Sequence, residues 1–175
     1  MPASKVHRAT ELFLQQYRLK GVNFEETLTR VSKMWDVFFG LKKPEMKSFP
    51  LEGKPGMIIV KDHIAWSFCP HHLLPVKYTF KIGYIPNKRV LGLSKPARIA
   101  DWICTQLPLQ EEIAYKVCEE IEQAIEPKGV ACVVQGEHLC MRMRGVESDH
   151  SNAVSSFVSG VFLISEATRM EFMRL

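Results

Sequence analysis

This chain of 175 residues lacks several features that define whole classes of protein. No run of about 18 apolar residues occurs, so the sequence predicts no membrane-spanning helix and no membrane partner. Basic residues form no cluster or stripe, and a net charge of +4 spread along the chain does not favour nucleic acid as a partner. Solenoid-type repeats and low-complexity segments are also absent, which excludes repeat arrays and disordered chains.

Cysteine is scarce. The chain has five, an odd number without disulfide-like spacing, which argues against a disulfide-stabilised scaffold. The opening stretch MPASKVHRATELFLQQYRLK lacks the unbroken apolar core of a signal peptide, so we expect a reducing, cytoplasmic location. The composition, 46% hydrophobic and 24% charged, is that of an ordinary globular protein with a substantial core.

Periodic apolar residues predict helices near the N-terminus. One imperfect helical stripe ends before Gly21, and a clearer one covers residues 31–39 after a cap at Glu26 or Thr27. Residues 41–56 are rich in proline and glycine and predict a connector made of turns.

The rest of the chain alternates pairs of strands with a pair of helices. Strands are predicted by β-branched and aromatic residues, and helices by apolar residues at helical spacing. Two strands are expected first, at residues 57–68 and 76–86, and two helices follow at 97–107 and 110–126. Two more strands are expected at 130–144 and 155–165, and a short last helix starts at Thr168. The segment HHLLP between the first two strands predicts an antiparallel pair, and Pro127-Lys128-Gly129 ends the second helix.

This β-β-α-α-β-β order predicts an α+β fold in which four strands backed by two helices form a two-layer unit. One face or edge of such a sheet stays open. Because unpaired edges invite pairing with another copy, the order also favours a homo-oligomer.

Two short motifs, SFCPHHLLP and EHLC, contain the residue types of a metal site. Cys69, His72 and Cys140 can supply two thiolates and one imidazole, which suit zinc better than magnesium or calcium. Three protein ligands leave a fourth position for an activated water, as in catalytic zinc sites. His71 and His138 then remain for proton transfer.

Backbone geometry sets conditions on this site. If a strand covers residues 129–140, Cys140 and His138 share a face, because side chains alternate along a strand. Cys69 and His72 are three apart, so a regular strand would send them to opposite faces. A bend between them is therefore required, and the proline that follows the cysteine is a plausible place for it.

Each motif can also arise in a plainer way. A free cysteine is often a small buried hydrophobic residue, and a lone histidine is more often a core or surface residue than a ligand. Two complementary half-sites favour the metal site over these alternatives. The other cysteines lie in stretches typical of amphipathic helix or buried strand, and we assign them to the core: Cys104, Cys118 and Cys132.

A series of longer motifs identifies a known family. RVSKMW, SFCPHHLLP, GYIPNKRVLGLSKPARI, LPLQEE, PKGVACVV, EHLCMRMRGV and TRMEF stand in the order and near the spacing of GTP cyclohydrolase I, which the chain resembles from about Arg30 to Glu171. That family uses zinc to convert GTP to 7,8-dihydroneopterin triphosphate and formate. The resemblance implies GTP as the substrate and Zn²⁺ as the cofactor.

The resemblance also implies the tunnelling fold (T-fold), whose two-layer units assemble into a ring barrel. Two five-subunit rings commonly stack as a decamer, with sites at subunit interfaces. On this basis we expect residues 1–40 to form a helical arm, 41–56 a connector and 57–175 the catalytic domain. The arm and connector are shorter than in many relatives, which leaves ring stacking and docking of a regulatory protein open.

The resemblance implies a role for each residue of the site. The three metal ligands and the two histidines keep the roles given above, and which histidine makes which transfer stays open. Glu111 matches the acid that anchors guanine, since a carboxylate can accept hydrogen bonds from the ring N–H and the exocyclic amine, and Gln110 matches a neighbouring binding position. The positions that handle ribose and triphosphate are matched by Ser94, Lys95, Arg98, Arg144, Arg30 and Lys33.

Ordinary structural roles are also open to some of these residues, and two positions depart from the family. Glu111 can be an acid favoured by the helix dipole, and the basic residues can be solvated surface charge. Arg30 and Lys33, however, share a face of an expected helix, which suits an anion. Pro70 replaces a common glutamate beside a metal ligand and can alter that ligand's contacts, whereas Pro96 starts a helix, where proline is tolerated.

Two other functions remain open. An enzyme that stops early would keep the site but release a formylated or ring-opened product, or accept a different purine nucleotide. A zinc-stabilised binding protein would keep the fold without turnover. The presence of His71, His138 and Glu111 argues against the second alternative, because such a protein would be free to lose them.

Overall fold

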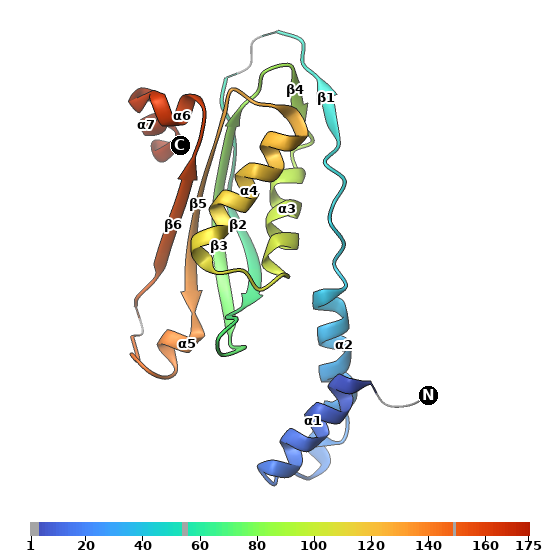
Figure 1. Cartoon of the computed structure of the whole chain (residues 1–175). Helices are drawn as coiled ribbons and strands as arrows, with labels where there is room; N and C mark the ends of the chain where they lie inside the picture. The colour runs from blue at the N-terminus through green and yellow to red at the C-terminus, as the bar shows by residue number, and fades with distance from the viewer. Residues whose placement is uncertain (1–3, 54–55, 149) are drawn as a thin grey trace. The chain divides into compact units, whose positions relative to one another are not determined.

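The computed structural model describes residues 4–53, 56–148 and 150–175, and the chain divides into two compact units at Lys42 and Lys43 (Figure 1). The N-terminal unit is a pair of helices, α1 (Lys5–Gln16) and α2 (Thr27–Phe39), joined through the 3₁₀ turn η1 (Val22–Phe24). Neither α1 nor α2 buries a residue. Across the described ranges, no helix is both long and apolar enough to cross a membrane.

The larger unit is built on a four-stranded antiparallel sheet of order β2-β3-β5-β6. Its strands are β2 (Ile58–Phe68), β3 (Pro75–Ile85), β5 (Gly129–His138) and β6 (Ala153–Val158). Two helices, α3 (Lys95–Cys104) and α4 (Gln110–Ile125), pack against one face (Figure 1). The predicted antiparallel pair and the β-β-α-α-β-β two-layer unit are therefore confirmed.

The core lies between this sheet face and the two helices. Alternate residues of β3 point toward α3 and α4 and are buried: Val76, Tyr78, Phe80, Ile82 and Tyr84. Burial of these large side chains supplies most of the drive for packing the two layers together. As predicted, three cysteines belong to this core: Cys104, Cys118 and Cys132.

A small second sheet has one of its two strands in the segment for which the sequence predicted only turns. There β1 (Ser48–Pro50) pairs antiparallel with β4 (Arg89–Leu91). Three residues are too few to show an alternating pattern, so the sequence carries no signal for this strand. The Tyr84 hydroxyl accepts a hydrogen bond from the Leu91 amide at 3.1 Å, which ties β4 to the main sheet.

The prediction of one strand through residue 144 is wrong. Strand β5 ends at His138, and α5 (Leu139–Arg142) follows as a single helical turn. The ladder with β3 ends at the pair Val76 and His138, and the ladder with β6 ends at Gly136 and Ala153. Beyond these pairs the backbone has no strand partner in the register, so it satisfies its polar groups within a helical turn instead.

The predicted strand at 155–165 is likewise half right. Strand β6 ends at Val158, and two short helices follow, α6 (Val161–Ile164) and α7 (Glu166–Arg174). Gly160 makes the break: its φ is 54°, and a Cβ there would lie 2.2 Å from the Lys128 carbonyl oxygen. Phe162 and Phe172 then pack on Ala131, which by alternation lies on the sheet face opposite α3 and α4.

Candidate metal centre and catalytic pocket

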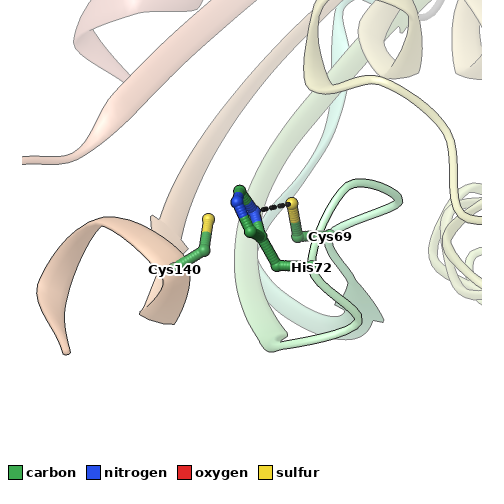
Figure 2. Close-up of side chains that lie close together, drawn as sticks. All are labelled: Cys69, His72 and Cys140. Atoms are coloured by element: carbon green, nitrogen blue, oxygen red, sulfur yellow. Dashed lines mark hydrogen bonds between the residues drawn. The ribbon is translucent and has the colours of Figure 1, made fainter. Parts of the chain in front are cut away.

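Cys69, His72 and Cys140 converge from the turn after β2 and from α5, as Figure 2 shows. Their ligand atoms all lie within 4.8 Å of one another, and Cys69 Sγ lies 3.5 Å from His72 Nδ1. Sulfur and nitrogen ligands bound to one tetrahedral zinc at about 2.3 and 2.1 Å would lie about 3.6 Å apart. The donor types and their spacing therefore fit zinc.

The turn between β2 and β3 explains how Cys69 and His72 reach the same side. The amides of His72 and Leu73 both donate to the Cys69 carbonyl oxygen, at 3.3 and 2.8 Å, and Leu73 has a φ of 52°. The Cys69 amide donates to the Leu74 carbonyl oxygen at 2.8 Å and closes the turn. Pro70 lies within it, where the ligand spacing predicted a bend.

Cys140 reaches the centre by a different route from the expected one. The sequence predicted that Cys140 and His138 share one face of a strand, but Cys140 lies on α5. The helical turn brings it back over the end of β5, so that both residues line the same cavity. The Met143 amide donates to the Leu139 carbonyl oxygen at 2.9 Å and closes this turn.

The cavity has a volume of about 300 Å³, which is the lower end of the range for ligand pockets. Its polar lining combines the three metal ligands, the two other histidines, the first two residues of α4, one residue of β3 and one of β6: Cys69, His71, His72, Tyr78, Gln110, Glu111, His138, Cys140 and Ser155. A larger hollow of about 560 Å³ lies in the N-terminal unit, but its described lining contains neither cysteine nor histidine. The chemistry is therefore concentrated at the smaller cavity.

Gln110 fixes a proton on Nε2 of His138. The Gln110 side-chain nitrogen donates to the Ala153 carbonyl oxygen at 2.7 Å, which fixes the orientation of the amide. Its oxygen then lies 2.5 Å from His138 Nε2, so that ring nitrogen carries the proton. Burial lowers the pKa of His138, although the Glu111 carboxylate raises it in part. The ring is therefore expected to be neutral at pH 7, with Nδ1 unprotonated.

Tyr78 belongs to the site, and sequence reasoning missed it. Its ring packs edge-on against His138, with 5.9 Å between the ring centroids, and burial raises the pKa of its hydroxyl. Across the β3–β5 ladder it faces Gly136, where a Cβ would lie 2.3 Å from the Gln110 side-chain oxygen. This glycine leaves room for Gln110 and Tyr78 beside His138. The strand register that pairs Tyr78 with Gly136 is the signal that would have found it.

The predicted phosphate- and ribose-binding residues are not among the described lining of the cavity. Three lie at the start of α3, and the described lining of the cavity does not include them: Ser94, Lys95 and Arg98. Arg144 follows α5 in an exposed segment. Burial raises the pKa of Cys140, and the charge of Arg144 opposes this in part. Arg30 and Lys33 belong to α2 in the N-terminal unit, where Arg30 pairs with Glu26 of its own helix.

Comparison with known proteins shows which family the chain matches. Residues 10–175 match the family model described as GTP cyclohydrolase I. The protein named GTP cyclohydrolase 1 of Aquifex aeolicus is 38% identical over 179 residues, which cover 98% of this chain and 95% of that relative. The protein of the same name from a Sulfurihydrogenibium species is 37% identical, covering 98% and 94%. GTP cyclohydrolase 1 2 of Pseudomonas aeruginosa is 45% identical over 119 residues, covering 68% and 66%.

Proposed function

The chain belongs to the GTP cyclohydrolase I family, and we propose that it carries out this reaction with a zinc ion bound by Cys69, His72 and Cys140. It is a hydrolase that opens the imidazole ring of GTP, releases formate and forms 7,8-dihydroneopterin triphosphate. Its catalytic unit has the tunnelling fold, with the β-β-α-α-β-β order described above.

The convergence of the three ligand atoms beside the cavity carries the zinc proposal. When bound, zinc lowers the pKa of a coordinated water to about 7, which supplies a nucleophile at neutral pH. The sulfur ligands disfavour magnesium and calcium, which prefer oxygen.

His138 and His71 supply proton transfer in this proposal. In this proposal His138, which lines the cavity, protonates N7 of the purine as water adds at C8. Because Gln110 holds the Nε2 proton, the ring acts as an acid only after it has taken up a second proton at Nδ1. His71 lines the same cavity, with Nδ1 3.8 Å from Cys69 Sγ, and assists the C–N cleavage that follows. Each ring can act as acid or base because an imidazole titrates near neutral pH. Formate then leaves from C8, the ribose opens and rearranges, and the pterin ring closes.

Substrate recognition is assigned to Glu111 and to the basic residues. Glu111 lies at the cavity wall in the first turn of α4, where its carboxylate can accept hydrogen bonds from the guanine edge. We assign Gln110 to the same subsite, and the triphosphate and ribose to Ser94, Lys95, Arg98, Arg144, Arg30 and Lys33. Because Ser94, Lys95 and Arg98 lie outside the described lining of the cavity, we propose that sites form between subunits of a ring-shaped homo-oligomer of ten chains. A cytosolic location fits five cysteines that are all free thiols.

One assay tests the reaction and the metal together. Purified protein is incubated with GTP and zinc, and formate and the fluorescence of the oxidised pterin are measured, with ATP as the control nucleotide. A formylated or ring-opened product identified by chromatography would show an enzyme that stops early. Cys140→Ala should lose metal and activity together, and full zinc occupancy in this variant by elemental analysis would refute the ligand assignment.

A further inference from the structure

Cys140 lies in the long connection between His138, the last residue of β5, and Ala153, the first of β6. Apart from the single turn of α5, this connection is held by few backbone contacts in the part that the structure describes. One of them joins the Ser148 amide to the Met141 carbonyl oxygen at 3.0 Å. A ligand in such a segment needs other contacts to keep it within bonding distance of a metal.

Arg142 supplies those contacts from the same helical turn. Its Nη1 donates to Glu137 Oε2 at 3.0 Å, and its Nη2 donates to Asn152 Oδ1 at 3.1 Å. Glu137 precedes the connection and Asn152 stands at its end, so one guanidinium joins both ends of the segment that contains Cys140. The Nε of Arg142 is buried, which indicates that the side chain packs against the protein.

Glu137 is itself anchored to the sheet. Its second carboxylate oxygen accepts a hydrogen bond from Lys77 Nζ at 3.1 Å, and Lys77 is its cross-strand partner on β3. The hydrogen bond from Lys77 and the charge of Arg142 hold the pKa of Glu137 below its usual value of 4.5. The carboxylate is therefore charged at neutral pH and accepts strong, charge-assisted hydrogen bonds.

We propose that Arg142 is a positioning residue that holds Cys140 at the metal centre through Glu137 and Asn152. This inference rests on the proposed zinc site. A planar guanidinium can bridge two acceptors in fixed directions, whereas a lysine ammonium is a point charge on a flexible stem. Loss of a residue that orients a metal ligand commonly weakens metal binding about 10- to 100-fold.

The test compares Arg142→Gln with Arg89→Gln in the full chain. Arg89 also makes two hydrogen bonds, to the hydroxyl and the carbonyl oxygen of Ser48, but these lie in the small β1–β4 sheet. Zinc affinity is measured by competition with a chelator, and hydrogen exchange is measured on metal-free protein in peptides that contain Cys140. We expect Arg142→Gln to bind zinc about 10- to 100-fold more weakly and to exchange faster around Cys140, with Arg89→Gln unchanged. Arg142→Lys should recover part of the affinity.

Two further measurements keep the outcome decisive. Asn152→Ala alters an exposed residue, so it should fold even if Arg142→Gln does not, and it should weaken zinc binding in the same direction but less. Wild-type affinity and wild-type exchange in both variants would overturn the positioning role. If the wild-type protein itself bound no zinc, the proposed metal centre would fail, and hydrogen exchange would still decide whether Arg142 holds the segment.

Discussion

At the scale of single residues, Gln110 gives His138 different surroundings from those of His71. It is 7% exposed, and its amide bridges the Ala153 carbonyl oxygen and His138 Nε2, so His138 enters the reaction with a defined proton. No corresponding side-chain amide contacts His71 among the described residues, where its neighbours are Cys69 and His72. This asymmetry is consistent with the proposal that the two histidines serve different proton transfers.

His138→Ala therefore separates metal binding from chemistry. The variant should retain zinc and GTP binding, because none of the three metal ligands is changed. Pterin formation should fall by about two to four orders of magnitude, the usual contribution of an acid–base catalyst. His7→Ala, in the N-terminal helix α1, is the control and should keep full activity. Wild-type turnover in His138→Ala would remove this histidine from the mechanism.

The first turn of α4 offers a matched test of guanine selectivity. Glu111 lines the cavity, whereas its neighbour Glu112 pairs with Lys116 on the helix surface. Glu111→Ala should weaken GTP binding by about 1.5–3 kcal/mol, the range for hydrogen bonds to a charged group, and should reduce the preference for GTP over ATP. Both binding constants can be measured by calorimetry. If Glu111→Ala and Glu112→Ala behave alike, Glu111 is merely a helix-start carboxylate.

At the scale of helices and strands, the sequence predicted elements best where their signals are local. The alternation of β3 and the helical stripes of α3 and α4 follow from nearby residues, so the two-layer unit could be predicted. The alternation of apolar and polar residues continues past His138, yet the strand ends there because its partners end. Strand length depends on distant pairing, which periodicity does not record.

The same distinction applies to the candidate site. The short motifs predicted the cysteines and histidines of the site, because these residue types at short spacing are distinctive. They did not reveal that Gln110 contacts His138 or that Tyr78 packs beside it, since both contacts depend on how α4 and β3 cross the end of β5. Gly136 leaves the space for Gln110 and Tyr78, but this role cannot be predicted from the sequence until the strand register is known.

The C-terminal helices pack on the sheet through two buried aromatic side chains, Phe162 of α6 and Phe172 of α7. Phe172 is 2% exposed and packs edge-on with Phe162, whereas its neighbour Met173 is 58% exposed. Phe172→Ala should lower the free energy of unfolding by about 3–5 kcal/mol through lost burial and a new cavity. Met173→Ala should change it by less than about 0.5 kcal/mol. Urea denaturation measures both changes in the free energy of unfolding. Equal changes in the two variants would show that burial of Phe172 does not stabilise the protein more than an exposed side chain of α7 does.

At the scale of the whole molecule, the sheet is incompletely covered in a single chain. Strands β2 and β6 each have one neighbour in the sheet, which leaves both outer edges unpaired. By alternation, Ile64, Trp66 and Val154 lie on the face opposite α3 and α4, and Trp66 is 57% exposed. A folded chain that leaves so much apolar surface and two strand edges open is best explained as one part of a closed assembly.

Closing strands from several copies into a barrel would remove these edges, so we propose a ring-based homo-oligomer, with ten chains as the number that the family resemblance implies. Light scattering coupled to size exclusion gives the mass: a fully active monomer of 20.0 kDa would exclude sites shared between subunits, whereas a five-chain species would exclude only the stacking of rings.

Co-expression of two variants tests directly whether subunits share sites, since Cys140→Ala and Arg98→Ala subunits are each expected to be inactive alone. If metal ligands and phosphate contacts come from different subunits, mixed rings contain some sites with both intact, and activity should partly return. Mixed rings that stay inactive would place both groups in the same subunit.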